Sequence, residues 1–268
     1  MSAESSLSSF SSPDRHAAVS DILRRRSTNH VDVRVALLRD LDLSGVHEVL
    51  DLGCGFGFMT ETVSQRIAPE ARIVGVDACP ANEQPYLDRV RRSGCTAQFT
   101  CRHIDTRLDW PDGAFDLVLA SYAVYFFPGV LPETARVLRP DGLLIAITHT
   151  ESSCAELVRI LDLPEFDSPL ISTIRQFSVE NARDRLTPWF GKIERIDYGN
   201  TLVFEEEHVA DLLVYVRFRL PLLFPGAEAC SEVPEPLERT IRAVLARRGR
   251  VVLEKHDAAF VCREPRCR

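Results

Sequence analysis

The 268-residue sequence lacks several features that would assign it to a class of protein at once. No apolar run approaches the roughly 20 residues that a membrane-spanning helix needs, and no secretory signal opens the chain. The net charge is -7, so the chain lacks the basic field expected of a protein that binds nucleic acid. We therefore expect neither a membrane association nor a nucleic-acid partner.

Paired cysteine motifs are also missing. The sequence has eight cysteines, but none of them form the C-x-x-C spacing typical of a zinc site. Cysteines scattered in this way suit a reducing compartment, where the residue serves as a small core side chain. We therefore predict a cytoplasmic location and no metal site, with a disulfide framework as the alternative. Residues 1–13 are rich in serine, and we expect a disordered tail there.

The most informative stretch that is present runs from Val46 to Asp77. An apolar run is followed by Gly53, Gly55 and Gly57, then by a helical pattern and a second apolar run that ends at Asp77. This order predicts a strand, a glycine turn, a helix and a parallel strand. The glycines let the backbone approach a ligand closely, because they have no Cβ. Asp77 lies about 20 residues past the turn, where such folds place the acid that holds a ribose.

The spacing of the glycines argues against a dinucleotide. A dinucleotide fingerprint has its third glycine one position later, and Phe58 occupies that position here. Asp51, at the end of the first strand, suits a cationic ligand better than a pyrophosphate. An NAD-dependent oxidoreductase is therefore the weakest of the functions considered.

Strands and helices continue to alternate up to about residue 148, which predicts a parallel, doubly wound α/β sheet. Ligands bind such sheets outside the carboxyl ends of the strands, where the strand order reverses. Asp105 follows the third predicted strand and Ser121 ends the fourth, so we expect both beside the glycine turn. Acids close three successive strands, at Asp51, Asp77 and Asp105, and together they indicate a cofactor site.

Segment 51–57, DLGCGFG, resembles the first motif of class I S-adenosylmethionine (SAM)-dependent methyltransferases. Segments 108–118 and 133–144 are similar to later motifs of this family, and the match covers roughly residues 46–148. It is nearest to the small-molecule enzymes of ubiquinone and menaquinone biosynthesis and related families. The resemblance implies SAM as the cofactor and a seven-stranded, mostly parallel sheet with an antiparallel last strand and a small helical lid.

The resemblance also implies the residues that hold the cofactor. The glycines would line its methionine part, Asp77 would hold the ribose hydroxyls, and Asp105 would accept from the adenine amino group. The full expected set is Asp51, Gly53, Cys54, Gly55, Gly57, Asp77, Ala78, Ile104, Asp105, Thr106 and Ser121. No catalytic residue is evident, since methyl transfer needs a base only when the nucleophile carries a proton. Tyr125 and His149 are candidate bases, and core packing or capping is the alternative for each.

The remaining segments are expected to surround this site. Residues 14–45 would form helices over the cofactor, and residues 46–268 the methyltransferase domain, with helical insertions at about 150–191 and 205–249. Within the insertions we predict a helix over 178–186 capped by Ser178, and a helix over 205–220 stopped by Pro221.

These observations predict the transfer of a methyl group from SAM to a small-molecule acceptor, at nitrogen, oxygen or carbon. A methyltransferase that acts on RNA or protein, and a non-methylating SAM-binding protein of the same fold, are the alternatives. The sequence identifies neither the acceptor nor the oligomeric state.

Overall fold

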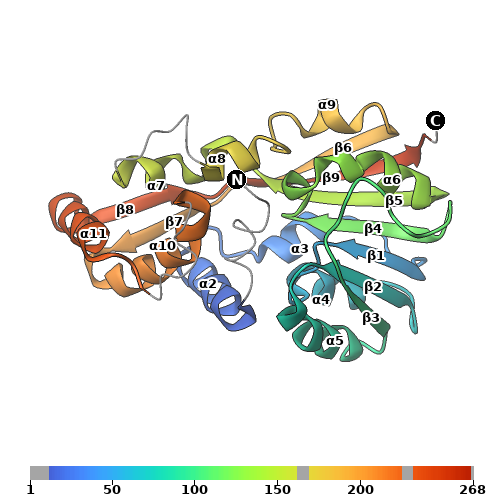
Figure 1. Ribbon diagram of the computed structural model, residues 1–268, viewed down its shortest axis with the longest axis horizontal. Helices are drawn as coiled ribbons and strands as arrows, with labels where there is room; N and C mark the ends of the chain where they lie inside the picture. Colours follow the sequence, from blue (N-terminus) through green and yellow to red (C-terminus); the bar gives the residue numbers. More distant parts are fainter. Residues whose placement is uncertain (1–11, 162–168, 225–231, 267–268) are drawn as a thin grey trace.

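The computed structural model describes residues 12–161, 169–224 and 232–266, which form two lobes (Figure 1). The sheet lobe contains a seven-stranded sheet, and the cap lobe contains a two-stranded sheet with its own helices. The parallel strands of the larger sheet run toward the cap lobe, because β9, which is antiparallel to β5, points to the opposite end of the molecule (Figure 1). The carboxyl ends of the parallel strands therefore face the cap.

The larger sheet confirms the predicted seven-stranded, mostly parallel architecture. The strand order is β3 (Thr96–Cys101), β2 (Arg72–Asp77), β1 (Glu48–Leu52), β4 (Phe115–Ser121), β5 (Leu138–His149), β9 (Asp257–Pro265) and β6 (Phe190–Tyr198). β1 pairs in parallel with both β2 and β4, so the strand order reverses at β1. β9 is antiparallel to both of its neighbours. The reversal at β1 marks the edge of the sheet where a ligand is expected.

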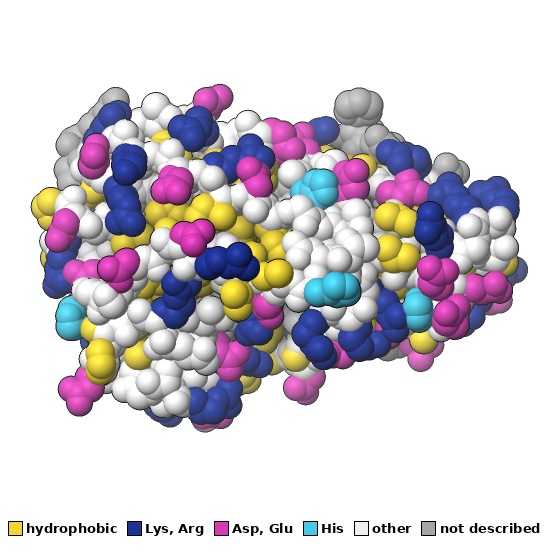
Figure 2. Space-filling view, turned by 180° about the vertical axis from the view of Figure 1, so that it is seen from behind, with side chains coloured by type: hydrophobic (Ala, Val, Ile, Leu, Met, Phe, Trp, Pro, Cys, Tyr) yellow, Lys and Arg dark blue, Asp and Glu magenta, His cyan; other side chains and the backbone are white. Residues whose placement is uncertain are grey.

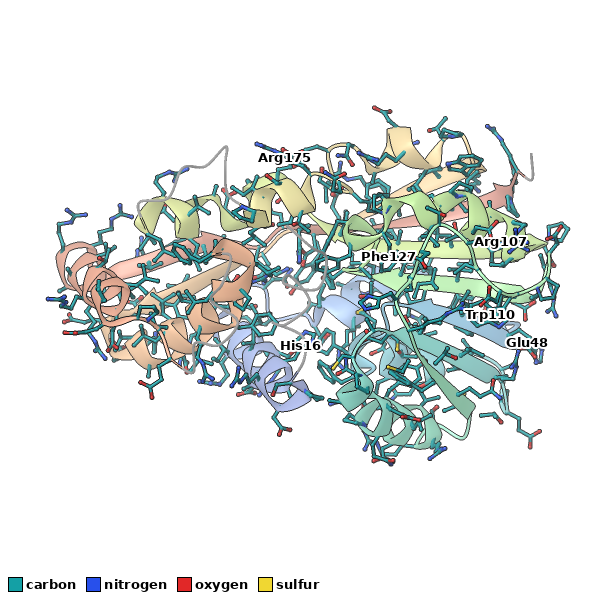
Figure 3. All side chains as sticks on the ribbon, in the orientation of Figure 1. His16, Glu48, Arg107, Trp110, Phe127 and Arg175 are labelled. Carbon is teal, nitrogen blue, oxygen red and sulfur yellow. The ribbon has the colours of Figure 1, made fainter. Side chains whose placement is uncertain are left out.

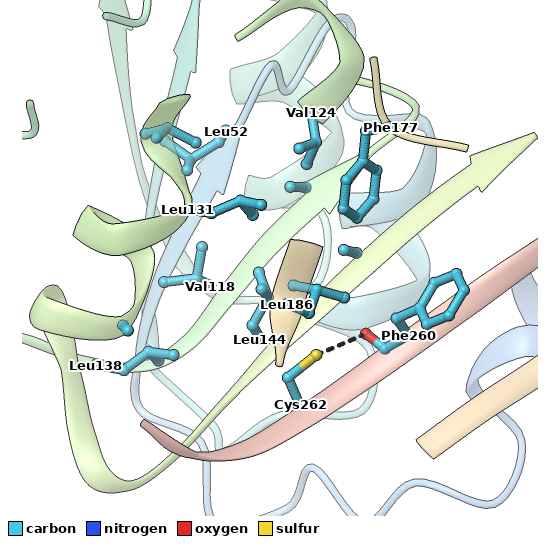
Figure 4. Close-up of a cluster of buried hydrophobic side chains, with 14 of the residues drawn as sticks. Leu52, Val118, Val124, Leu131, Leu138, Leu144, Phe177, Leu186, Phe260 and Cys262 are labelled. Atoms are coloured by element: carbon cyan, nitrogen blue, oxygen red, sulfur yellow. Dashed lines mark hydrogen bonds between the residues drawn. The ribbon is translucent and has the colours of Figure 1, made fainter. Parts of the chain in front are cut away.

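Helices cover both faces of this sheet, because its inner strands are apolar on both sides. Successive residues of β1 show the pattern: Val49 packs toward one core, and Leu50 packs toward the other. One face is covered by α6 (Leu131–Val137) and α9 (Ala182–Leu186), and the other by α3 (Val33–Leu38), α4 (Phe58–Ser64) and α5 (Glu83–Arg91). Figure 4 shows part of the core beneath α6 and α9.

The cap lobe has a hydrophobic core of its own. Its sheet pairs β7 (Thr201–Glu205) with β8 (Arg250–Glu254), and its helices are α2 (Pro13–Arg26), α7 (Ala155–Ile160), α8 (Pro169–Ile174), α10 (Val209–Leu223) and α11 (Glu235–Arg248). Most of it lies between the end of β6 and the start of β9. Those two strand ends adjoin each other, because Tyr198 pairs with Asp257. The chain therefore leaves the large sheet and returns to it at one point.

Single-turn helices fill several connections, at η2 (Pro80–Asn82), η3 (Val124–Phe126), η4 (Pro128–Val130), η5 (Glu151–Cys154) and η6 (Glu206–His208). Within the described parts of the chain, no helix is long and apolar enough to cross a membrane.

Two predicted helix boundaries are wrong. α10 does not stop at Pro221 but continues through it to Leu223. The proline removes one backbone donor, but the neighbouring Leu220 and Leu222 pack into the cap core, and this packing outweighs the local cost. The predicted helix at 178–186 begins only at Ala182, after a turn over residues 179–181. Ser178 does not cap it, since its hydroxyl donates to Glu151 at 3.2 Å.

The sequence also gave no sign of β7, which completes a small sheet inside the predicted lid. The lid is thus helical with a two-stranded sheet at its centre. Of the predicted tail, residues 1–11 lie outside the described residues, whereas Ser12 and Pro13 begin α2. The Ser12 hydroxyl accepts the Arg15 N–H at 3.4 Å, as an N-cap does.

Gly75, in the middle of β2, permits the close packing beneath the glycine turn. A Cβ at this position would lie 2.5 Å from Tyr86 Cζ and 2.7 Å from Cys54 Sγ, and Tyr86 is fully buried. We expect Gly75→Ala to lower the free energy of unfolding by about 1–3 kcal/mol, as overpacking does. Urea unfolding followed by circular dichroism measures this.

The matched control is Gly45→Ala, where an added Cβ meets no atom within 4 Å. Equal stability of the two variants would contradict the packing role assigned to Gly75.

Candidate functional site

A cavity of about 1000 Å³ lies between the carboxyl edge of the large sheet and the cap lobe. Its walls come from the glycine turn, the ends of β2, β4 and β5, helices α2 and α10, and the segments that connect the lobes. Figure 3 shows His16, on α2, and Phe127, after η3, at the junction of the lobes, and both line the cavity. A volume of this size is at the upper end of small-molecule sites, so it has room for a cofactor and a second ligand.

The glycine turn forms one wall of this cavity. Gly53 and Gly55 both have positive φ angles, +70° and +51°. A Cβ on Gly53 would lie 2.5 Å from the Cβ of Ala123, whereas a Cβ on Gly55 would point into open space. Gly57, at φ +84°, is the N-cap of α4 and does not reach the cavity as described. The first two glycines therefore shape the ligand wall, and Gly57 starts the helix behind it.

Two of the predicted acids face the cavity beside the turn. Asp77 accepts the Gly55 N–H at 2.9 Å, the Cys79 N–H at 2.9 Å and the Asn82 amide at 3.0 Å. Asp51 is 1% exposed, and Thr60 donates its hydroxyl hydrogen bond to it. Burial raises the pKa of Asp51 to about 7, and the Asp77 carboxylate adds to the rise. A cationic neighbour would favour the ionised form of a carboxyl group that is buried in this way.

The end of the third strand only partly meets the prediction. Ile104 lines the cavity together with its neighbours Arg102 and His103. Asp105 and Thr106 do not line it in the structure as described, and the Thr106 methyl group instead approaches Gly129. Contact of Asp105 and Thr106 with a ligand thus stays a prediction.

The structure brings most of the remaining predicted residues to one place. The cavity is lined by Asp51, Gly53, Cys54, Gly55, Asp77, Ala78, Ile104, Ser121, Tyr125 and His149, all of which were expected at the site. It also adds residues beyond that expected set, notably His16, Tyr122, Arg219, Lys255 and Asp257.

Three of these added residues surround His149. Lys255 donates to both oxygens of Asp257, at 2.8 and 2.6 Å, and the Tyr122 hydroxyl donates to the second oxygen at 2.9 Å. His149 Nδ1 lies 2.7 Å from the first oxygen, and the Tyr122 ring stacks on the imidazole at 4.6 Å. The signal that could have found this group is the pairing of the last strand, which sets Asp257 opposite His149.

The charge states in this cluster follow from burial and from Lys255. Burial and, after it, the Lys255 ammonium lower the pKa of His149 to about 4, although the Asp257 carboxylate acts in the opposite direction. Burial opposes ionisation of Asp257, but Lys255 and His149 outweigh it and hold its pKa at about 2. At neutral pH the site therefore contains an ionised Asp257, a charged Lys255 and a neutral imidazole.

Tyr122 holds its ring in this cluster through an unusual backbone conformation. Its φ of +54° is in the left-handed region, which a bulky residue rarely adopts. The Tyr122 N–H donates to the Ile147 carbonyl at 2.8 Å, which ties the residue to β5 directly after β4 ends. Strain of this kind is characteristic of residues whose position matters to a site.

His16 joins the cap to the glycine turn. Its ring packs edge-on against Phe56 at 4.7 Å and stacks on Phe218 of α10 at 5.3 Å. Burial, aided by Arg219, lowers the pKa of His16 to about 4, so this ring is also neutral at physiological pH. α2 is thus fixed over the mouth of the cavity by aromatic contacts to both lobes.

Comparisons with known proteins agree with this geometry. Residues 49–142 match a family described as "Methyltransferase domain". Trans-aconitate 2-methyltransferase from Escherichia coli is 34% identical over 113 residues, covering 41% of this chain and 42% of the relative. Protein-L-isoaspartate O-methyltransferase from Triticum aestivum is 30% identical over 128 residues, covering 46% and 54%. The chain thus matches about half the length of these relatives.

A solved structure extends the likeness to nearly the whole chain. The YcgJ protein from Bacillus subtilis is 16% identical, with a TM-score of 0.52 over 93% of this chain and 99% of that protein. Identity this low shows a shared fold alone. Together with the family match over residues 49–142, the glycine turn and the strand order, it shows the class I, Rossmann-like methyltransferase fold.

Proposed function

We propose that this protein transfers a methyl group from SAM to a small-molecule acceptor, at nitrogen, oxygen or carbon. The observation that carries the proposal is the pair of acids beside the glycine turn, Asp51 and Asp77, on the wall of a cavity large enough for two ligands. The cytoplasmic location expected from the scattered cysteines is part of the same proposal.

The residues at the turn fit SAM. Gly55 offers open space where a side chain would stand, and Asp77, with three donors on its carboxylate, retains capacity for a ribose hydroxyl. The buried Asp51 suits the ammonium and sulfonium charges of this cofactor. In this proposal Gly53, Cys54, Gly55 and Ala78 line the cofactor, and Ile104 and Ser121 border it. Asp105 accepts from the adenine amino group with Thr106 beside the ring, and Gly57 begins the helix behind the glycine turn.

SAM, when bound there, would supply a methyl group on a positively charged sulfur. The chain's own contribution is then to position the acceptor and to exclude water, which accounts for much of the rate of such a displacement. The cap lobe does both, since α2 and α10 close the side of the cavity opposite the sheet.

A small acceptor suits the surface as well as the cavity. Acidic and basic side chains are interspersed over the face shown in Figure 2, so that face carries no broad basic field for a polyanion. The two curated relatives named above act, by their names, on trans-aconitate and on a protein residue. Acceptors that differ this much offer no basis for transferring one of them to this chain.

The first test concerns Asp77. Asp77→Asn keeps the shape but removes the charge that would hold the ribose hydroxyls, and hydrogen bonds to charged groups contribute about 1.5–3 kcal/mol. We expect the affinity for S-adenosylhomocysteine to fall by about tenfold or more, as measured by titration calorimetry. Asp40→Asn, at an exposed position outside the cavity, is the charge-matched control. An unchanged affinity in Asp77→Asn would refute this role.

The second test uses the pKa of Asp51, which is about 7 in the free protein. A cationic ligand favours the ionised carboxylate, so binding below pH 7 must release a proton from Asp51. We expect the affinity for SAM to fall about tenfold between pH 8 and pH 6. This is the largest change in affinity that uptake of one proton by a group with a pKa of about 7 can cause over that range.

Asp51→Asn is the control for the ligand's own titration, because the ligand is the same and only the protein group is removed. If wild type and Asp51→Asn show the same pH dependence in calorimetry, Asp51 does not sense the cofactor's charge.

A further inference from the structure

The hydrogen-bond pattern around Asp257 assigns the proton positions of His149. The carboxylate of Asp257 has four contacts, two from Lys255 and one each from Tyr122 and His149. Lys255 and Tyr122 can only donate to it, and a carboxylate accepts about four hydrogen bonds in all. His149 Nδ1 lies 2.7 Å from an Asp257 oxygen and 3.2 Å from Lys255 Nζ. The shorter contact decides the proton position: Nδ1 donates to Asp257, because an unprotonated nitrogen would lie 2.7 Å from an anionic oxygen. The other nitrogen, Nε2, therefore carries the lone pair.

This lone pair is available to a ligand. His149 lines the cavity, and within the described chain no group forms a hydrogen bond to its Nε2. His149 is 7% exposed, and its Nε2 is not sealed from solvent. Stacking of Tyr122 at 4.6 Å and of Tyr125 at 6.1 Å restricts rotation of the ring. The imidazole is thus neutral, fixed in one tautomer and open on the side away from Asp257.

On the basis of the proposed function, we propose that His149 is the general base for methylation of a hydroxyl group on a planar aromatic acceptor, with Asp257 and Lys255 as positioning residues. In the step, the acceptor's O–H proton moves to His149 Nε2, and an oxygen lone pair forms the new bond to the methyl carbon. The carbon–sulfur bond breaks and its electron pair stays on sulfur, which gives neutral S-adenosylhomocysteine. The imidazolium, stabilised by Asp257, then returns the proton to solvent.

The choice of a hydroxyl follows from what the other acceptor types need. A carboxylate already has a free lone pair at neutral pH, so it has no use for a base. An ammonium group does need a base, but the Lys255 ammonium lies 3.2 Å from the imidazole, and Arg219 is a second cation on the cavity wall. These charges disfavour a cationic acceptor and stabilise an oxygen that becomes negative as it loses its proton.

The walls around His149 indicate the shape of the acceptor. Tyr122 and Tyr125 stack on His149, and Phe126 packs on Tyr125. Further aromatic side chains line the same cavity from both lobes, namely Phe127, Tyr198 and Phe218. Flat walls of this kind bind flat rings by stacking and edge contacts. A phenol therefore meets all three conditions: its O–H gives a proton to His149, its oxygen becomes negative near Lys255 and Arg219, and its flat ring fits the aromatic walls.

The acceptor class is tested with methyl-labelled SAM and three matched probe pools: simple phenols and catechols, benzoates, and benzylamines. We expect label in the phenol pool. Label in the benzoate or benzylamine pool, or in none of the three while S-adenosylhomocysteine still binds, would overturn the inference. Loss of S-adenosylhomocysteine binding itself would instead remove the proposed function, so the two failures are distinguishable.

The role of His149 is tested with His149→Gln. General-base catalysis contributes about 10²–10⁴-fold, so we expect kcat for an unactivated phenol to fall at least a hundredfold, with KM and S-adenosylhomocysteine affinity little changed. A nitrophenol that is already ionised at about pH 8 needs no base, so its loss should be under about tenfold. His256→Gln, at an exposed position next to the cluster, is the matched control and should retain full activity.

A merely structural role would slow both phenols equally, and that result would overturn the assignment. The pH profile gives a second readout, because the groups that face His149 are Lys255, Asp257, Tyr122, Tyr125 and Arg219. The active form is the neutral imidazole, so kcat should stay level as pH falls and decline only near pH 4. A decline centred on the ordinary histidine value, about 6.5, would contradict the buried, Lys255-facing setting.

Discussion

The buried carboxylate of Asp257 connects the parts of this molecule. It lies at the first residue of β9, accepts from Lys255 in the segment that returns from the cap, and faces His149 at the end of β5. Asp257 is 3% exposed and Lys255 is 7% exposed, so neither charge is compensated by water. Removing one member of a buried pair costs about 3–5 kcal/mol, since the other charge is left alone. The carboxylate therefore ties the segment that returns from the cap to the ends of β4 and β5, through Lys255, Tyr122 and His149.

Both lobes contribute residues to the cavity. The sheet lobe contributes the glycine turn, Asp51 and Asp77, which are set by the reversal of strand order at β1. The cap lobe contributes His16 of α2 and Phe218 and Arg219 of α10, two helices that pack into a separate core. The wall at the glycine turn is thus built from a local turn, whereas the wall around His149 depends on contacts between elements far apart in sequence.

This division explains what could be predicted from the sequence. The sheet was predictable because its inner strands are continuous apolar runs separated by glycine and proline turns, and Asp51 and Asp77 directly follow such runs. The cluster around His149 was not, because Asp257 lies 108 residues later in the chain. Finding it requires the antiparallel register of β5 and β9, which no local pattern encodes. Asp105 illustrates a different limit: it follows a predicted strand, but it does not line the cavity in the structure as described, so its contact with the cofactor stays a prediction.

The adjoining ends of β6 and β9 have a consequence for how this fold can vary. Tyr198 and Asp257 pair across the two strands, so the excursion between them begins and ends at the same place. A tight hairpin of two residues would join those ends without changing the register of the large sheet. Segment 199–256 can thus vary in length while the strands beneath it stay paired, but its hydrophobic core is shared with α2, α7 and α8, which lie outside it. Lys255 lies within this segment, and Asp257 is the first residue of β9. A replacement of the segment must therefore supply another cation to pair with the Asp257 carboxylate.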